Sequence, residues 1–368
     1  MDHNATTPVR PEAQAAVMEA LALVGNPSSV HGPGRAARRI VEDAREKVAE
    51  LVGWEPSGVI FTGGGTEANN LAVRGSDRGR VLASAVEHVS VLDATPKVEE
   101  IPVDESGVVE VEALDSMLSA GGAPALVSVM AANNETGVLQ PVAEVSAVAG
   151  RAGALMHCDA VQAAGKMEVD LSALGADMVT LSAHKIGGPA GVGALVIAND
   201  APVAPMIRGG GQERRRRAGT ENVAGIAGFG AAAEAALAGL SDFARLAEWR
   251  DRIEARLAER AEIKVFGSGT PRLANTTCLT MPGVAAEAQI IALDLLGVAV
   301  SAGSACSSGK VEPSHVLQAM GADKAEAATA IRVSLGWDTA EQDIERFISA
   351  WAEVRAKMGG KDERTAAA

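Results

Sequence analysis

Short apolar runs and longer amphipathic segments alternate along the first two thirds of the chain. Apolar runs that end in small or polar residues predict buried strands at residues 81–86, 125–131, 176–181 and 192–197. Apolar positions three or four residues apart predict helices at residues 11–24, 35–52 and 141–153. Strands that alternate with helices indicate an α/β fold with a mostly parallel sheet.

The pattern changes in the last third of the chain. We expect strands at 273–281 and 298–301, a helix at 287–296 and a closing helix within 338–358, which together suggest an α+β module. An alanine-rich helical stretch, residues 221–260, leads into it. We therefore predict a large domain over residues 12–245. Residues 1–11 and 246–368 are expected to form a smaller domain.

Two ionisable residues follow successive apolar strands. Asp159 ends the run 155–159, and Lys185 follows the run 176–181 after two small residues and His184. The carboxyl ends of parallel strands open into one crevice, so both side chains should meet there. Burial at a strand end lowers the pKa of a lysine and makes its amine a usable nucleophile. Pyridoxal phosphate enzymes combine such a lysine with a carboxylate, although the lysine alone is more simply explained as exposed.

A triple glycine, Gly63-Gly64-Gly65, lies between an apolar strand and a helix that begins at Thr66. Free N–H groups and the helix dipole at such a place suit a phosphate monoester. The spacing differs from the dinucleotide-binding fingerprint, and the sequence contains no Walker motif. The glycine loop therefore predicts a phosphate site formed by Gly65 and Thr66.

The three cysteines differ in their surroundings. Cys158 and Cys278 fall within predicted strands and are expected to be buried, whereas Cys306 lies among small residues in 301–309. Cys306 is therefore interpreted as an exposed and usable thiol. No CxxC pair is present and three cysteines cannot all pair, which favours a reducing cytoplasm as the location.

With these motifs in place, the chain resembles the class V aminotransferase family and, within it, the NifS/IscS-like cysteine desulfurases. The resemblance runs from Asn4-Ala-Thr-Thr-Pro8 to Ile331-Arg-Val-Ser-Leu-Gly336. Its most specific part is Ser301-Ala-Gly-Ser-Ala-Cys306-Ser-Ser. It implies the aspartate-aminotransferase-like fold (fold type I), with a seven-stranded type of sheet. It also implies pyridoxal 5'-phosphate (PLP) as cofactor, L-cysteine as substrate, a homodimer and a sulfur-acceptor protein.

The resemblance also implies roles for individual residues. Lys185 would hold PLP and move the substrate α-proton, Asp159 would keep the ring protonated, and Cys306 would take up the sulfur as a persulfide. Arg332 would bind the substrate α-carboxylate, and His88 would stack over the ring and help to move protons as a catalytic residue. Without the motifs, His88 and Arg332 would be interpreted as a satisfied strand-end histidine and a surface arginine.

Further cofactor contacts follow in the same way. Gln162 would bind the phenolic oxygen, Ser182 and His184 the phosphate side, Asn134 the cofactor or substrate, and Thr220 the phosphate of a partner subunit's cofactor. Relatives commonly carry a larger residue at Gly187, so the loop past Lys185 is expected to be slimmer here.

Charge and composition weigh against other classes of function. The net charge is −14, and only 2% of the residues are aromatic. Both argue against direct nucleic-acid binding, despite the run Arg214 to Arg217. No apolar run is long enough to span a membrane, and we predict no metal site. A selenocysteine lyase, another class V aminotransferase and a catalytically silent scaffold in sulfur transfer remain as alternatives.

Overall fold

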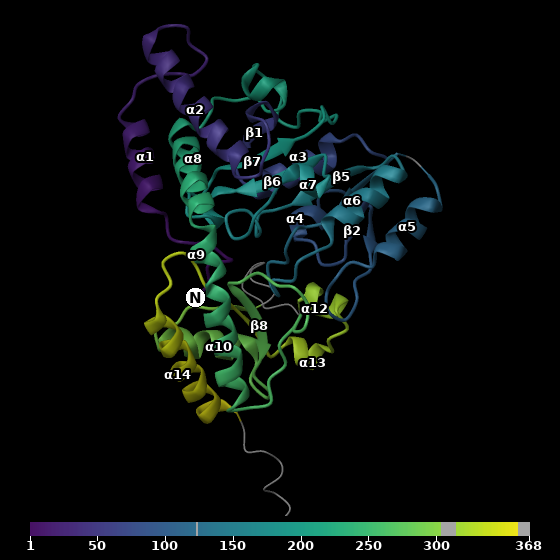
Figure 1. The fold of residues 1–368 in the computed structure, drawn as a ribbon, viewed down its shortest axis with the longest axis vertical. Coiled ribbons are helices and arrows are strands. Elements are labelled where there is room, and N and C mark those ends of the chain that lie inside the picture. Colours follow the sequence, from purple (N-terminus) through teal and green to yellow (C-terminus); the bar gives the residue numbers. More distant parts are fainter. Residues whose placement is uncertain (123, 303–313, 360–368) are drawn as a thin grey trace, which may run out of the picture.

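A seven-stranded sheet forms the centre of the computed structural model, which describes residues 1–122, 124–302 and 314–359 (Figure 1). The strands are β1 (Val59–Thr62), β2 (Arg80–Ser84), β3 (Val98–Ile101), β4 (Ala125–Ser128), β5 (Leu155–Asp159), β6 (Met178–Ser182) and β7 (Gly193–Ile197). Their spatial order is β1-β7-β6-β5-β4-β2-β3. β7 runs antiparallel to both of its neighbours and the other pairs are parallel, so the predicted mostly parallel sheet is confirmed.

Helices cover both faces of this sheet. One group is α1 (Pro11–Leu21), α2 (Gly32–Glu50) and α8 (Val223–Ala238), which lie side by side in Figure 1. The others are α3 (Gly65–Gly75), α4 (Val89–Leu92), α5 (Val111–Ser119), α6 (Val142–Arg151) and α7 (Leu171–Leu174). Along β6, Met178 packs in the core cluster that contains Leu71 of α3, whereas Val179 packs in the cluster that contains Phe229 of α8. The strand is therefore buried on both faces, as continuous apolar strands in parallel sheets are.

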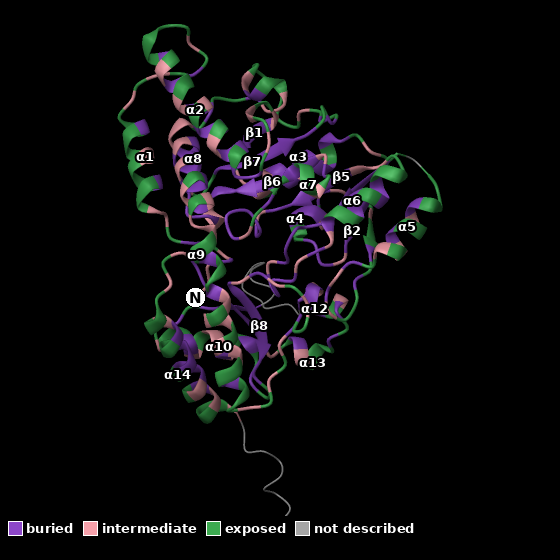
Figure 2. Cartoon of the chain, in the orientation of Figure 1, coloured by how far each residue is buried: buried purple, intermediate pink, exposed green. Residues whose placement is uncertain are grey.

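A three-stranded antiparallel sheet forms a second module, with β10 (Ala330–Ser334) between β8 (Thr276–Thr280) and β9 (Ser301–Ala302). Its helices are α9 (Leu240–Ala244), α10 (Leu246–Ala258), α11 (Ala286–Leu295), α12 (His315–Ala319), α13 (Lys324–Ala327) and α14 (Glu341–Met358). A separate core cluster, which includes Ile253 and Trp351, lies beneath α9, α10, α11 and α14, whereas α12 and α13 pack in the core cluster of the large sheet. Figure 2 shows the labelled strands of both sheets mostly buried, and the edge strand β3 is partly exposed. The predicted domain boundaries stay a prediction.

Two predicted elements differ most clearly from the structure. Of the predicted strand 298–301 only Ser301 is in a strand, and β9 is Ser301–Ala302, since these are the residues in the described part of this segment that pair with β10. The predicted helical stretch 221–260 is divided into α8, α9 and α10. The first break comes at Gly239, whose φ/ψ is not helical, and glycine destabilises the interior of a helix.

The N-terminal residues connect the two modules. Asp2 forms a bridge with Ser334 of β10, and the N–H of Asn4 donates to the Ser334 hydroxyl at 2.9 Å. The N–H of Thr7 then donates to the main-chain oxygen of His184 at 3.1 Å. This segment therefore places Asn4 between the second module and the end of β6.

In the described ranges, no single helix combines the length and apolarity needed to cross a membrane. The consecutive stretches Val223–Ala238 and Leu240–Ala258 have the necessary length and apolarity only when they are taken together, and the chain bends by 63° between them.

Candidate active site

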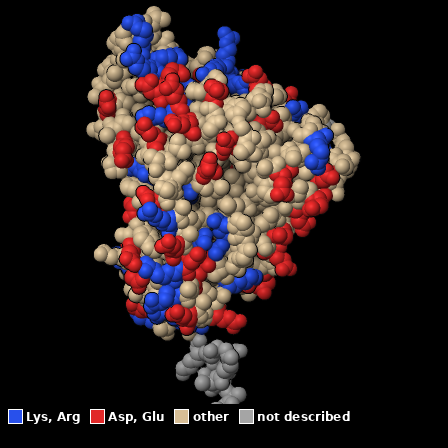
Figure 3. Space-filling model, in the orientation of Figure 1, with Lys and Arg blue, Asp and Glu red and all other residues tan. Residues whose placement is uncertain are grey.

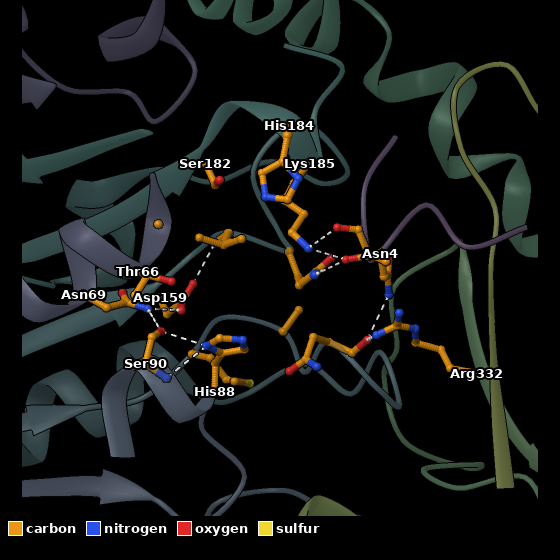
Figure 4. A pocket seen from close by; sticks show the side chains of 17 residues that line it. Asn4, Thr66, Asn69, His88, Ser90, Asp159, Ser182, His184, Lys185 and Arg332 are labelled. Atoms are coloured by element: carbon orange, nitrogen blue, oxygen red, sulfur yellow. Dashed lines mark hydrogen bonds between the residues drawn. The ribbon is translucent and has the colours of Figure 1, made fainter. Parts of the chain in front are cut away.

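A cavity of about 420 Å³ lies at the carboxyl ends of the central strands. The sequence-predicted residues that line it are Gly65, Thr66, His88, Asn134, Asp159, Gln162, Ser182, His184, Lys185 and Arg332. Thr220 does not line it, because this residue is exposed in the connection between η3 (Gln212–Arg215) and α8. Cys306 lies outside the described residues. Figure 4 shows Asp159 at one end of the cavity, Arg332 at the other and Lys185 between them.

Lys185 ends the short helix η2 (Ala183–Lys185), which follows β6 directly. Its Nζ donates to the main-chain oxygens of Asn4 and Ala5, the latter at 2.8 Å. Burial, and then the positive charge of Arg332, lower the pKa of Lys185 to about 8, while Asp2 and Asp159 act in the opposite direction. The amine is thus far more readily deprotonated than an exposed lysine, which agrees with the expectation from its place at a strand end.

Asp159 is the last residue of β5 and is only 6% exposed. Its Oδ2 accepts from Asn69 Nδ2 at 2.7 Å, and its Oδ1 accepts from the N–H of Val161 at 2.9 Å. No lysine or arginine pairs with it in the described part of the chain. The carboxylate is therefore oriented by neutral donors while it lines the cavity.

His88 caps the N-terminus of α4, and its ring nitrogen Nδ1 accepts the N–H of Ser90 at 3.1 Å. The Ser90 hydroxyl lies 2.7 Å from the same nitrogen and also accepts from Asn69. Burial lowers the pKa of His88. The negative charge of Asp159 raises this pKa, and the charges of Lys185 and His315 lower it. Because Nδ1 accepts, the proton of the neutral ring is assigned to Nε2.

A cluster of donors surrounds the N-terminus of α3. Gly64, the residue before the helix, has a φ of 148° and caps it with no side chain, so the first-turn N–H groups at Gly65 and Thr66 have no side-chain cap. Ser182 and His184 line the same cavity. Burial, and then Lys185, lower the pKa of His184 to about 4, which keeps its ring neutral. The site therefore offers neutral donors and a helix dipole to an anion.

Arg332 extends from β10 at the other end of the cavity. Its Nη2 donates to Asp2 Oδ1 at 2.8 Å and its Nη1 donates to the main-chain oxygen of Asn134 at 3.1 Å. Its Nε is buried and has no hydrogen-bond partner among the residues that the structure describes. The guanidinium is thus held in place while its Nε–H stays available as a donor, an arrangement that suits a planar carboxylate.

Sequence reasoning missed four polar residues of this site. Asn4, Asn69 and Ser90 line the cavity, and Asp2 holds Arg332. Asn69 had a readable signal, because it is a polar residue on the buried side of α3, 1% exposed. Asn4 and Asp2 had no such signal, since their partners lie more than a hundred residues away.

The chain is similar in sequence and in fold to known proteins. The aminotransferase class-V family model matches residues 1–347. An IscS-like cysteine desulfurase of Mycobacterium tuberculosis is 43% identical over 365 residues, which cover 94% of this chain and 93% of the relative. A cysteine desulfurase of Cereibacter sphaeroides is 45% identical over 364 residues, with 95% and 93% covered. The NifS-like protein of Rickettsia africae superposes with a TM-score of 0.90 at 36% identity, covering 96% of this chain and 98% of that one. The resemblance drawn from the motifs is thus confirmed, and the chain belongs to the class-V aminotransferase family.

Proposed function

We propose that this chain is a PLP-dependent cysteine desulfurase, which converts L-cysteine to L-alanine and retains the sulfur on Cys306. One observation carries the proposal. Lys185, with an amine pKa of about 8, shares a single cavity with the Asp159 carboxylate, the uncapped N-terminus of α3 and Arg332. Cysteine desulfurases are also what the relatives above are named.

The donor set fits PLP in its chemistry. Gly65, Thr66, Ser182 and His184 would hold the phosphate, and Asp159, which lines the same cavity, would face the pyridinium nitrogen. The hydrogen bonds from Asn69 and Val161 support this role, because they orient the carboxylate without neutralising it. Lys185 would hold the cofactor covalently, and Gln162 would donate to its phenolic oxygen. When bound, PLP supplies an electron sink for the charge that develops at the substrate α-carbon.

The chain's own residues would then act on the substrate. Arg332 would bind the α-carboxylate of L-cysteine, and its buried, unpartnered Nε supports this role. The Lys185 amine would take the α-proton, which a pKa of about 8 allows near neutral pH. His88 would lie over the ring, with its Nε2 proton free to donate. The wall around Asp159 and Lys185 would exclude water from these steps.

Sulfur transfer balances without an external oxidant. The Cys306 thiolate would attack the substrate sulfur, so that a sulfur–sulfur bond forms as the substrate carbon–sulfur bond breaks. The electron pair of the broken bond stays with the substrate carbon, which takes up a proton and leaves as alanine. Cys306 becomes a persulfide, ready to pass its outer sulfur to an acceptor. We propose a protein acceptor, either an iron–sulfur scaffold or a tRNA-thiolation protein.

A homodimer is part of this proposal. Thr220 is exposed and does not line the cavity of its own chain, so it is free to reach the phosphate of a partner subunit's cofactor. Such a contact would make each site complete only in the dimer. Gel filtration of the PLP-loaded protein should therefore give twice the chain mass, and Thr220→Val should weaken PLP binding without changing the apparent mass.

The activity is tested by measuring alanine and sulfide release from L-cysteine with a reductant present. Wild type, Cys306→Ala and a control, Cys278→Ala, are compared, and PLP absorbance is recorded for each. Cys278 suits the control because it is fully buried and burial raises its thiol pKa, so it cannot serve as a carrier. We expect wild type and the control to release both products and Cys306→Ala to bind PLP but release neither.

Full activity in Cys306→Ala would contradict the sulfur-carrier role and favour a lyase or an aminotransferase. A matching assay with L-selenocysteine separates these two, because only a selenocysteine lyase would release selenide and alanine in preference to the sulfur products. A wild type that binds PLP yet acts on none of these substrates would favour the silent scaffold.

A further inference from the structure

A second buried lysine lies behind the wall of the cavity. Lys166 is 5% exposed and follows Gln162 by four residues. No carboxylate lies within ion-pair distance of its Nζ in the described ranges. Burial lowers the pKa of Lys166 well below its usual range, and the charges of Lys185 and Arg332 add to this. A lysine kept in such a place without an acid needs another reason for its presence.

Both acceptors of Lys166 belong to residues of the cavity. Its Nζ donates to Gln162 Oε1 at 2.6 Å and to Asn4 Oδ1 at 2.9 Å. Because the Gln162 oxygen is turned towards Lys166, its amide nitrogen must face the other way. There Nε2 donates to the main-chain oxygen of Asn4 at 3.1 Å, on the side of the cavity. Lys166 thus fixes which end of the Gln162 amide is presented.

The same amine fixes Asn4. With Oδ1 turned to Lys166 and to Asn275 Nδ2 at 3.1 Å, Asn4 Nδ2 donates to Thr276 Oγ1 at 2.9 Å and to the main-chain oxygen of Asn134 at 3.1 Å. The main-chain oxygen of Asn4 is left to accept from Lys185, as Figure 4 shows. One buried donor therefore contacts both Gln162 and Asn4, the residue whose main-chain oxygen accepts from Lys185, and it shares the orientation of Asn4 with Asn275.

We propose that Lys166 is a positioning residue for the PLP site, which turns the Gln162 donor towards the cofactor and holds the Asn4 carbonyl beneath the Lys185 amine. The inference rests on the proposed function in that it takes PLP to be the ligand. It does not require that L-cysteine be the substrate. Lys166 touches neither the cofactor nor the reacting atoms and acts only through Gln162 and Asn4.

The test measures PLP binding and the pH titration of the bound-PLP absorbance in Lys166→Met, which keeps the apolar stem and removes the donors. We expect the dissociation constant for PLP to rise about tenfold, the effect of one lost buried hydrogen bond. The titration midpoint should move to higher pH by about one unit, because a misplaced Gln162 no longer stabilises the anionic phenolic oxygen. Lys47→Met, which loses an exposed ion pair with Glu234, is the matched control and should match wild type in both readouts.

A double-mutant cycle separates positioning from simple packing. If Lys166 acts through Gln162, adding Lys166→Met to Gln162→Ala should change the dissociation constant much less than it does in wild type. Fully additive effects, or a Lys166→Met protein with wild-type affinity and titration, would overturn the proposal. Should Lys166→Met fail to fold, Lys166→Gln is measured in the same way, and failure of both to fold overturns the proposal by assigning Lys166 to the core.

The outcomes also separate this inference from the proposed activity. A wild type that binds PLP but releases no alanine removes the desulfurase proposal and leaves the Lys166 measurements decisive. A wild type that binds no PLP overturns both.

Discussion

A buried ion pair attaches the segment before Thr220 to the large sheet. Arg45 of α2 donates to both carboxylate oxygens of Glu213, at 2.8 and 3.0 Å, and the N–H of Phe61 donates to the same carboxylate at 2.9 Å. The two side chains are 5% and 2% exposed. Glu213→Gln keeps the shape of the side chain but removes its charge, so it leaves the buried Arg45 guanidinium with only the more exposed Glu42 carboxylate, 3.1 Å from Arg45 Nε, as a counter-charge.

The expected cost follows from this geometry. Removing one member of a buried pair typically lowers the free energy of unfolding by about 3–5 kcal/mol. We expect about 3 kcal/mol, because the glutamine oxygen can still accept from either Arg45 or Phe61. Backbone strain works against this loss, since Glu213, Arg214 and Arg215 have φ values of 43°, 54° and 65°. Each such residue costs about 1–2 kcal/mol in the folded state, and a segment released from Arg45 can relax and recover part of that free energy.

Chemical denaturation of the cofactor-free protein measures the change in the free energy of unfolding. The matched control is Glu234→Gln, the same chemical change in the exposed Lys47–Glu234 pair, where we expect a loss of less than about 1 kcal/mol. The double variant Arg45→Met/Glu213→Leu should recover much of the loss, because it removes the isolated charge. The reasoning is refuted if Glu213→Gln and Glu234→Gln unfold with the same free energy.

Three further predictions concern the cavity. PLP should bind the cofactor-free protein faster as pH rises through about 8, because deprotonation of Lys185 supplies the amine; stopped-flow absorbance measures this, and a midpoint near the ordinary lysine value of 10.5 would contradict the lowered pKa. Asp159→Asn should bind PLP yet lose about 100-fold or more in the rate of alanine release, while Asp170→Asn, a change at the cap of α7, keeps the wild-type rate; an unchanged rate in Asp159→Asn would remove the role of Asp159. Gly187→Ala should lower the free energy of unfolding by about 1–3 kcal/mol, since φ is 89° and the added Cβ meets Arg10 Cγ at 2.5 Å. Gly191→Ala, with a φ of 79° and open space, isolates the backbone part, and equal losses would exclude the Arg10 contact.

The central part of the site could be predicted from the sequence, because it depends on local pattern and one topological rule. Apolar runs located β5 and β6, and the parallel order of these strands brings Asp159 and Lys185 to one crevice. The glycine loop likewise predicted the N-terminus of α3, where Gly65 and Thr66 line the same cavity. In each case the residues that signal the element also carry the chemistry.

The supporting groups could not be found in this way, because their function depends on partners that are distant along the chain. Asn4 receives hydrogen bonds from Lys166, Lys185 and Asn275, up to 271 residues away. Nothing in the local sequence of Asn4 or Lys166 indicates burial, since a polar residue near the N-terminus and a lysine after a glycine are ordinarily exposed. The hydrogen-bond network, and not the periodicity, decides that these residues are inside. Lys166, which contacts both the Gln162 amide and the Asn4 side chain, therefore supports the site although it does not line the cavity.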